Sequence, residues 1–242
     1  MGVILYLISL PINWTLLWLK WNVIVFVVLP LSFIYNQLII YRNRLVFTID
    51  IARKAHNRKV LAIQKQVREW ASAKRTTKMY PVENGWLSSN PIPTKGVTPI
   101  CTGNLVDILE IDQAAMSVRV EPMVTMDELS RLLIPLGYCI PLLPAANDLT
   151  VQELINGGGV GTSGRKYGMF QHICISYELV MPDGSLITAT REKRNESDAQ
   201  GLFYGIPWSQ GTLGILVAAT LRLIPIKPFV KLTYTPTKSI GV

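Results

Sequence analysis

Histidine and cysteine are scarce in this sequence, which has two histidines and three cysteines among 242 residues. The cysteines, Cys101, Cys139 and Cys174, lie far apart and form none of the spacings that zinc sites use. His56 and His172 are the two histidines of the sequence, so few side chains could serve as zinc ligands or as the base of a Ser-His-Asp triad. The sequence therefore argues against a metal centre and a hydrolytic triad, and three dispersed thiols fit a reducing compartment.

Acidic residues are also few, since 16 Asp and Glu stand against 24 Lys and Arg and give a net charge of +8. Many of the basic side chains gather in one segment: Arg42, Arg44, Arg53, Lys54, Arg58, Lys59, Lys65 and Arg68. No aromatic-basic platform of the kind that binds nucleic acid accompanies them. We therefore expect no nucleic-acid partner, and the positive charge needs another explanation.

Long apolar stretches precede this basic segment. Residues 1–19 and 21–41 carry no ionised side chain, and only Lys20 separates them. Each is long enough to cross ~30 Å of hydrocarbon at about 1.5 Å per residue. Residues 21–41 are the better span, and a buried helix of a soluble protein is the alternative for both stretches. Residues 1–19 read as a second span, a signal-like region or an amphiphilic lead-in, and we favour a retained anchor because a basic n-region and a cleavage site are missing.

The basic residues after the span predict its orientation. By the positive-inside rule they place the rest of the chain in the cytoplasm, and they can also contact anionic headgroups. We expect a membrane anchor over residues 1–41, a basic juxtamembrane helix over 42–75, and an α+β domain of two small subdomains over 76–242. Within this plan residues 47–74 read as one long helix and residues 81–99 as a loop.

Short sequence patterns predict the helices and strands of the α+β domain. Strands are expected at residues 99–102, 107–111 and 117–121. Thr125 and Glu128 form a capping box that opens a helix ending at Gly137, whose glycine fits a left-handed cap. A β-hairpin is expected over residues 173–190, with its turn at Pro182-Asp183-Gly184.

A glycine-rich segment is the most informative part of the chain. Thr150 and Glu153 form a second capping box that starts a short helix to Ile155, and residues 156–164 then hold five glycines. Backbone N–H groups in such a run can approach a pyrophosphate without interference from Cβ atoms. Residues 159–164 also spell G-x-G-x-x-G, but a Rossmann fingerprint needs a strand before it and a helix after it. Here a helix precedes and a hairpin follows, which disfavours the Rossmann interpretation.

The glycine run alone also fits a flexible surface loop without a ligand. A second glycine segment, residues 207–217, changes that balance. In it Gly211 and Gly214 are separated by Thr-Leu and lead into an apolar strand over residues 215–224 that Pro225 stops. Two glycine sites in one domain favour a bound ligand with a phosphate group.

The order of capped helix, glycine loop, Pro-Asp-Gly hairpin and Gly-Thr-Leu-Gly strand resembles the vanillyl-alcohol-oxidase (PCMH) type of FAD-binding domain. It is most similar to the Δ24-sterol reductase branch of that family, over about residues 23–236. The sequence strings that carry the resemblance are residues 63–70, 107–112, 118–125, 166–173 and 202–214. Long strings of this kind are far more specific than a single glycine motif.

The resemblance implies a flavoprotein of sterol biosynthesis. It implies that NADPH reduces a non-covalently bound FAD, which passes hydride to the Δ24 side-chain double bond of a sterol. It also implies a single-pass protein of the endoplasmic reticulum membrane, with the Golgi membrane as an additional location, and a cytoplasmic globular domain. The residues expected to hold FAD are Thr150, Val151, Ile155, Asn156, Gly157, Gly158, Gly159, Val160, Gly161, Thr162, Ser163, Trp208, Gly211, Gly214 and Ile215.

No residue stands out as a catalytic acid or base. Lys166, Tyr167 and His172 are candidates, although packing or phosphate contacts suit the first two better and a hydrogen-bonded structural role suits His172 better. The catalytic residues therefore stay unassigned, as do the particular sterol and the oligomeric state.

The sequence departs from the family pattern in four places. Gln152-Glu153 stands where the family has two small residues, Gly161 replaces an acidic residue, and Arg165 replaces a histidine. The chain also ends at Val242, whereas family members continue about as far again with a domain that covers the flavin and shapes the sterol site. The alternative function is therefore a truncated, non-catalytic, membrane-tethered module that binds FAD or a partner.

Overall fold

The chain divides into two compact units, Met1–Leu45 and Val46–Val242, which are described in turn. The computed structural model describes residues 20–48, 51–73, 76–82, 96–144, 146–191, 197–227, 229 and 231–234.

The first unit is helical from Lys20 onward. A π-helical turn, η1 (Ile24–Val28), runs into α2 (Leu29–Thr48), whose last residues pass into the second unit. Large apolar side chains are exposed along it, among them Phe26 at 72% and Leu31 at 64%. Among the helices formed by described residues, none has both the length and the apolar character needed to cross a bilayer. The span expected over residues 21–41 is thus not confirmed, and residues 1–19 lie outside the described part of the chain.

The second unit starts with the long helix α3 (Ile51–Ser72), which confirms the helix expected over residues 47–74. Its buried side is apolar, with Val60, Ile63 and Val67 each at most 5% exposed. These positions recur every three or four residues, so they form one face of a 3.6-residue period and pack onto the body of the unit. The opposite side carries charged residues that face solvent.

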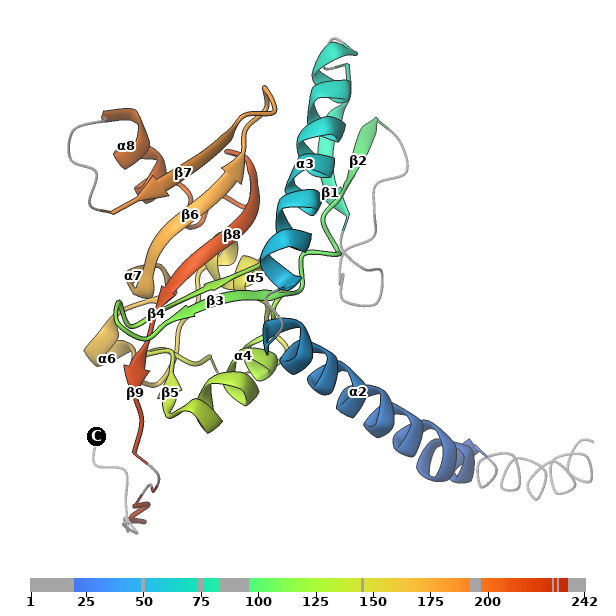
Figure 1. The fold of residues 1–242 in the computed structure, drawn as a ribbon, viewed down its shortest axis with the longest axis vertical. Coiled ribbons are helices and arrows are strands. Elements are labelled where there is room, and N and C mark those ends of the chain that lie inside the picture. Colours follow the sequence, from blue (N-terminus) through green and yellow to red (C-terminus); the bar gives the residue numbers. More distant parts are fainter. Residues whose placement is uncertain are drawn as a thin grey trace, which may run out of the picture. The chain divides into compact units, whose positions relative to one another are not determined.

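A five-stranded antiparallel sheet forms the centre of the second unit, with strand order β3-β4-β8-β6-β7 (Figure 1). Its strands are β3 (Ile108–Asp112), β4 (Ser117–Val120), β6 (Cys174–Val180), β7 (Leu186–Thr190) and β8 (Ile215–Arg222). The strands expected at residues 107–111 and 117–121 and the hairpin are confirmed here, whereas the strand expected over residues 215–224 ends at Arg222. Since every pairing in this sheet is antiparallel, the Rossmann interpretation, which requires parallel strands, is wrong.

Both faces of this sheet are covered. On one face Leu216 and Leu221 of β8 belong to a large cluster with Leu129 of α4 (Met126–Leu133), Ile155 of α5 (Val151–Gly157) and Phe203 of α8 (Ser197–Gly205). On the other face Ile215 and Val217 of β8 belong to a cluster with the buried side of α3. Alternating side chains of one strand therefore enter two apolar layers, which accounts for the near-continuous apolar sequence of β8.

Capped helices frame the glycine loop as the sequence predicted. α4 (Met126–Leu133) continues into the 3₁₀ turn η2 (Ile134–Leu136), and Gly137 ends it with φ +86°. The N–H of Glu128 donates to Thr125 Oγ1 and the N–H of Thr125 donates to Glu128 Oε2. α5 (Val151–Gly157) begins with an equivalent box at Thr150 and Glu153.

The region around the prolines differs from the expectation. β1 (Lys78–Val82) and β2 (Val97–Cys101) form a parallel two-stranded sheet, so a loop over all of residues 81–99 is wrong at both ends. Residues 83–95 lie outside the described part. Pro81 and Pro99 are tolerated because each strand has one partner in this small sheet, which leaves an edge where a missing N–H breaks no bond.

Short elements complete the second unit. One-turn helices α6 (Gly164–Tyr167) and α7 (Phe170–Ile173) follow the glycine loop, in keeping with the absence of a crossover helix there. The remaining elements are α8 (Ser197–Gly205), which the sequence did not reveal, and the antiparallel pair β5 (Tyr138–Cys139) and β9 (Ile224–Pro225). The mixed α+β content expected from the sequence is confirmed.

Candidate cofactor-binding site

The two glycine segments lie against each other. The Trp208 N–H donates to the Ile155 carbonyl oxygen at 3.1 Å, which ties the second segment to α5. A Cβ added to Gly211 would lie 3.7 Å from Asn156 Nδ2, so the Asn156 side chain lies next to the second segment. The fold therefore joins the two segments that the sequence singled out separately.

Close packing within the chain explains why parts of the loop must be glycine. Gly158 has φ +81°, and a Cβ added there would lie 2.2 Å from the Trp208 ring. A Cβ added to Gly161 would lie 2.5 Å from the Leu143 carbonyl oxygen. These glycines let the loop fold tightly over its own neighbours, which is a structural need besides any ligand contact.

The same loop leaves a run of backbone donors unused. Among the described residues, the N–H groups of residues 159–163 donate to no carbonyl or side-chain acceptor. The Ser163 hydroxyl donates to the Pro141 carbonyl oxygen at 2.8 Å, and the Gly164 N–H closes the turn on the Gly161 carbonyl oxygen. Most of residues 159–163 are exposed or half-buried, and successive backbone N–H groups in a glycine-rich loop are a usual means of binding phosphate oxygens.

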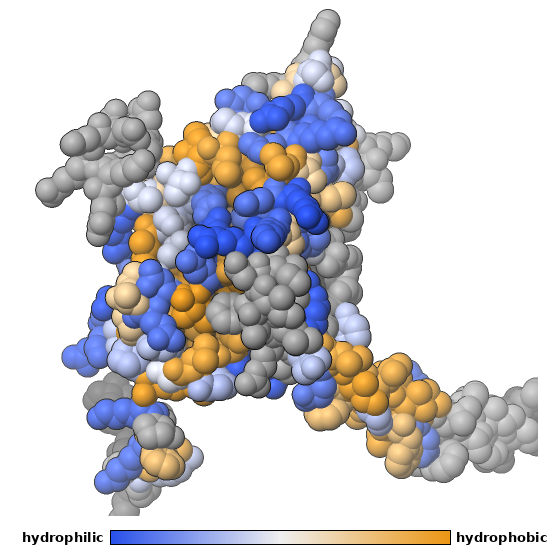
Figure 2. Space-filling model, in the orientation of Figure 1, coloured by the Kyte–Doolittle hydropathy of each residue, from blue (hydrophilic) through white to orange (hydrophobic). Residues whose placement is uncertain are grey.

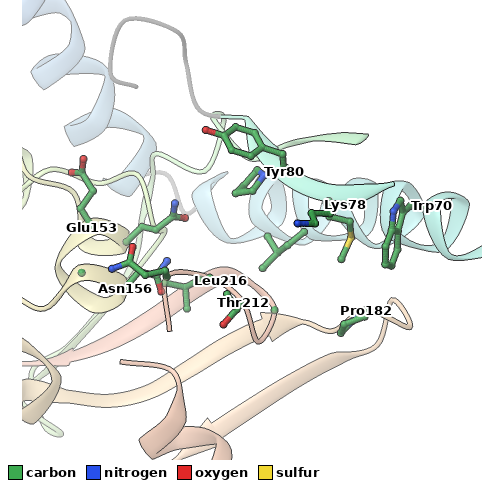
Figure 3. Close-up of a pocket in the computed structure, with 16 residues that line it drawn as sticks. Trp70, Lys78, Tyr80, Glu153, Asn156, Pro182, Thr212 and Leu216 are labelled. Carbon is green, nitrogen blue, oxygen red and sulfur yellow. The ribbon is translucent and has the colours of Figure 1, made fainter. Parts of the chain in front are cut away.

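A cavity of about 760 Å³ opens beside these segments (Figure 3). Tyr80, Lys78 and Trp70 stand along one side of it and face Asn156 and Thr212 across the opening. Its remaining lining residues are Met79, Pro81, Gln152, Glu153, Gly157, Pro182, Gln210, Gly211, Gly214, Ile215 and Leu216. This size is in the range of pockets that enclose a cofactor or drug-sized ligand.

The cavity contains some of the predicted site residues and excludes others. Five of them line it: Asn156, Gly157, Gly211, Gly214 and Ile215. Thr150, which caps α5, and Val151 and Ile155, which belong to that helix, are buried and do not line the cavity. The predicted residues 158–163 and Trp208 lie outside the cavity lining as well, next in sequence to Gly157 and Gln210.

Sequence reasoning missed the wall that β1 and the end of α3 supply. The Trp70 indole N–H donates to the Thr77 carbonyl oxygen at 2.8 Å, which fixes the ring, and Tyr80 adds a second aromatic side chain. Lys78 is the cationic side chain among the lining residues. The prolines in this region argued against a strand. The feature that indicates β1 is the alternation of polar and apolar residues over 78–82, which Pro81 interrupts.

Gln152 and Glu153 both line the cavity, where the resemblance predicted two small residues. The Glu153 carboxylate accepts from the Thr150 N–H at 2.8 Å and from the Thr150 hydroxyl at 2.9 Å. This carboxylate is therefore held by the cap of α5. It brings a negative charge to the wall opposite Lys78, and the capping bonds restrain its movement.

The three candidate acid or base residues lie outside the cavity lining. His172 Nδ1 accepts from the Met169 N–H at 2.9 Å, which supports the structural role expected for it. Lys166 Nζ lies 4.9 Å from the centre of the Tyr167 ring, a cation–π contact. Burial raises the pKa of the Cys174 thiol to about 12, so this group stays protonated and serves packing. The site therefore has the features of a binding site without an evident proton donor.

Comparisons with known proteins agree with this geometry. A model of the FAD binding domain family matches residues 61–190, a range that includes the second half of α3, β1 and the glycine loop. The chain is 45% identical to a Δ24-sterol reductase homologue of Caenorhabditis elegans over 92% of this chain and 44% of that protein. It is 43% identical to the human Δ24-sterol reductase over 91% and 42%, and 33% identical to that of Arabidopsis thaliana over 90% and 39%. The chain thus spans less than half the length of these curated relatives.

Proposed function

Because the chain belongs to the family of FAD-binding domains, we propose that its two glycine segments and the adjoining cavity bind FAD non-covalently. The observation that carries this proposal is the run of N–H donors at residues 159–163, which have no acceptor among the described residues and follow the cavity-lining Gly157 in sequence. FAD joins a doubly charged pyrophosphate to two ring systems. A donor run that continues from a partly apolar cavity suits both parts.

The described residues have separate roles in this proposal. The N–H groups of residues 159–163 donate to the pyrophosphate oxygens, and Lys78 adds positive charge. Trp70 and Tyr80 offer aromatic surfaces against which a planar ring can pack. Trp208 covers Gly158 and holds the second segment in place. When bound, FAD supplies the capacity to accept and donate hydride, while the protein positions it and limits access of water.

We further propose that the chain is the flavin domain of a Δ24-sterol reductase that uses NADPH. The support is the sequence identity to proteins of that name over nine-tenths of this chain. No side chain of the described residues is assigned as an acid or base in this reaction. The proposal therefore assigns binding and orientation to this domain and leaves the proton donor unassigned.

The proposal includes attachment to the endoplasmic reticulum membrane through residues 1–41, with the second unit in the cytoplasm. Two observations support it. Apolar side chains are exposed along η1 and the first part of α2, where a protein without a partner would leave them in water. A basic segment follows them, as the positive-inside rule requires for a cytoplasmic domain.

A second candidate function is a non-catalytic module that binds FAD at the membrane. The favouring observation is that the candidate acid or base residues Lys166, Tyr167 and His172 all lie outside the cavity lining. In that case the second unit retains the cofactor and does not itself reduce a sterol.

A staged experiment separates these possibilities. The chain is purified in detergent, supplied with FAD, and its visible spectrum is recorded. Absence of flavin absorbance after gel filtration would contradict both candidates. Bound flavin that NADPH bleaches, together with conversion of a Δ24-sterol, is expected for the reductase. Bound flavin without sterol conversion would favour the non-catalytic module.

A further inference from the structure

The solvent-facing side of α3 carries a narrow cationic stripe. Lys54, Arg58, Leu61 and Lys65 are all exposed, with Leu61 at 62% and the Lys65 side chain at 78%. At 3.6 residues per turn these four positions fall within about 60° of arc, on the face opposite the buried residues of α3. Figure 2 shows hydrophilic residues gathered over this helix. We call these four residues the α3 stripe.

The charges of the stripe are poorly compensated. Within the described part of the chain, neither Lys54 nor Arg58 forms an ion pair. Lys65 approaches Glu69 at 3.9 Å, but both side chains are largely exposed, so water screens this pair strongly. The stripe therefore presents net positive charge, in contrast to Lys59 on the same helix, which contacts two carboxylates at 2.7 Å.

Fold stability does not require this arrangement. None of the four residues belongs to an apolar cluster or contributes to the cavity. Long basic side chains around an exposed leucine are compatible with a helix that lies on lipid. There the basic heads reach phosphate groups and the apolar side chain enters the interface.

Continuity of the chain favours lipid over other anionic surfaces. Residues 49–50 alone separate α3 from α2, and the helical segment that ends in α2 exposes Phe26, Leu29 and Leu31. If that segment enters a membrane, the start of α3 is held near the headgroups. Lys54 follows Tyr41, the last residue of the apolar stretch, by 13 residues, so the chain would then tether the stripe near the headgroups. Lys65 lies about 16 Å further along the helix axis, so it contributes only if α3 lies along the surface.

We propose that the α3 stripe binds the headgroups of an anionic lipid surface and so holds α3 along the membrane. This inference rests on the membrane attachment proposed above, and it is independent of FAD binding. The stripe would add a salt-sensitive contact with the membrane to the apolar attachment through residues 1–41.

The test uses the full chain reconstituted into vesicles, with a polarity-sensitive dye on Leu61→Cys in a Cys101→Ser, Cys139→Ser background. One set of vesicles is phosphatidylcholine, and the other contains added phosphatidylserine. We expect a blue-shifted emission, quenched by headgroup-attached quenchers, with the anionic vesicles only, and we expect raised salt to reverse it. The same dye on Thr188→Cys, an exposed residue of β7, should not respond.

Charge variants complete the test. The triple change Lys54→Glu, Arg58→Glu, Lys65→Glu should abolish the blue shift. A matched reversal at Arg222, Lys227 and Lys231, which are exposed elsewhere, should keep it. An equal dye response with neutral and anionic vesicles, or a response that survives the triple change, would overturn the proposal. A response to polyglutamate but not to anionic vesicles would also overturn it, and would indicate an acidic protein surface instead.

Failure of the underlying proposals is visible separately. Flotation with neutral vesicles reports the apolar attachment, and retained flavin absorbance reports FAD binding. If the chain leaves neutral vesicles, salt-sensitive flotation with anionic vesicles still tests the stripe, and its absence would overturn the inference.

Discussion

At the scale of single residues, Gly158 combines a left-handed backbone with a side-chain neighbour that leaves no room for a methyl group. Gly158→Ala places a Cβ 2.2 Å from the Trp208 ring at φ +81°. We expect the ring to be displaced, the free energy of unfolding to fall by about 1–3 kcal/mol, and FAD to bind more weakly. Urea unfolding and FAD titration measure the two effects.

The matched control is Gly164→Ala, because a Cβ at Gly164 meets nothing within 4 Å and the residue lies in α6. Equal stability and equal FAD affinity for the two variants would contradict the packing role of Gly158.

The cysteines offer a second test at this scale. Burial raises the pKa of Cys174 to about 12 because its thiolate would lose hydration, whereas Cys101 is exposed on β2. At mildly alkaline pH we expect iodoacetamide to label Cys101 and to leave Cys174 unmodified until the chain is denatured. Peptide mass spectrometry distinguishes the sites, and labelling of native Cys174 at the rate of Cys101 would contradict its burial.

The sign of the pH effect follows from the same shift. In the unfolded chain a thiol titrates near pH 8.5, about its ordinary value. Above that pH the unfolded chain loses the proton that folded Cys174 retains, so the contribution of this group to stability is complete at neutral pH and falls as the pH rises toward about 12.

At the scale of elements, a buried ionic cluster attaches α3 to the sheet. The Glu121 side chain is fully buried, and it contacts His56 Nδ1 at 2.8 Å and Lys59 Nζ at 2.7 Å. Its Oε2 also accepts from the Asp107 N–H at 2.8 Å. Glu121→Gln removes the shared negative charge while it keeps the size, so we expect the free energy of unfolding to fall by about 3–5 kcal/mol.

The control is Glu110→Gln on β3, whose pair with Arg53 at 3.3 Å is about half exposed on both sides. That change should cost about 0–1 kcal/mol. Chemical denaturation compares the two, and a loss for Glu121→Gln no greater than that for Glu110→Gln would show that the cluster does not secure α3.

Which elements could be predicted depends on how local their causes are. Both capping boxes, the left-handed Gly137 and the hairpin turn follow from residues three or fewer positions apart, and the structure contains all of them. The strand β1 could not be foreseen, because its stability comes from a parallel partner across residues 83–95 and its sequence contains Pro81. The sequence also left α8 unassigned. Its contacts are with β7, which no local pattern reports.

The candidate site shows the same limit at the scale of the whole second unit. The glycine segments were identified by composition, since a close backbone approach needs residues without a Cβ, and five of the predicted residues line the cavity. Trp70, Lys78 and Tyr80 were missed because the folded sheet alone brings the end of α3 and β1 to face Asn156. A cavity assembled from five separate stretches of sequence has no signature in any one of them.

The division into two units gives the last prediction at this scale. All residues that line the cavity belong to Val46–Val242, whereas the exposed apolar residues from Trp21 to Tyr41 belong to Met1–Leu45. Deletion of residues 1–41 should therefore release the protein from membranes and leave its FAD content unchanged. Fractionation of membranes from expressing cells, with flavin absorbance of each fraction, measures both.

A deleted chain that stays on membranes after a high-salt wash would show that residues 1–41 are not the anchor. Release by that wash alone would assign the remaining attachment to charge, because salt screens the contacts of Lys54, Arg58 and Lys65 but strengthens apolar ones.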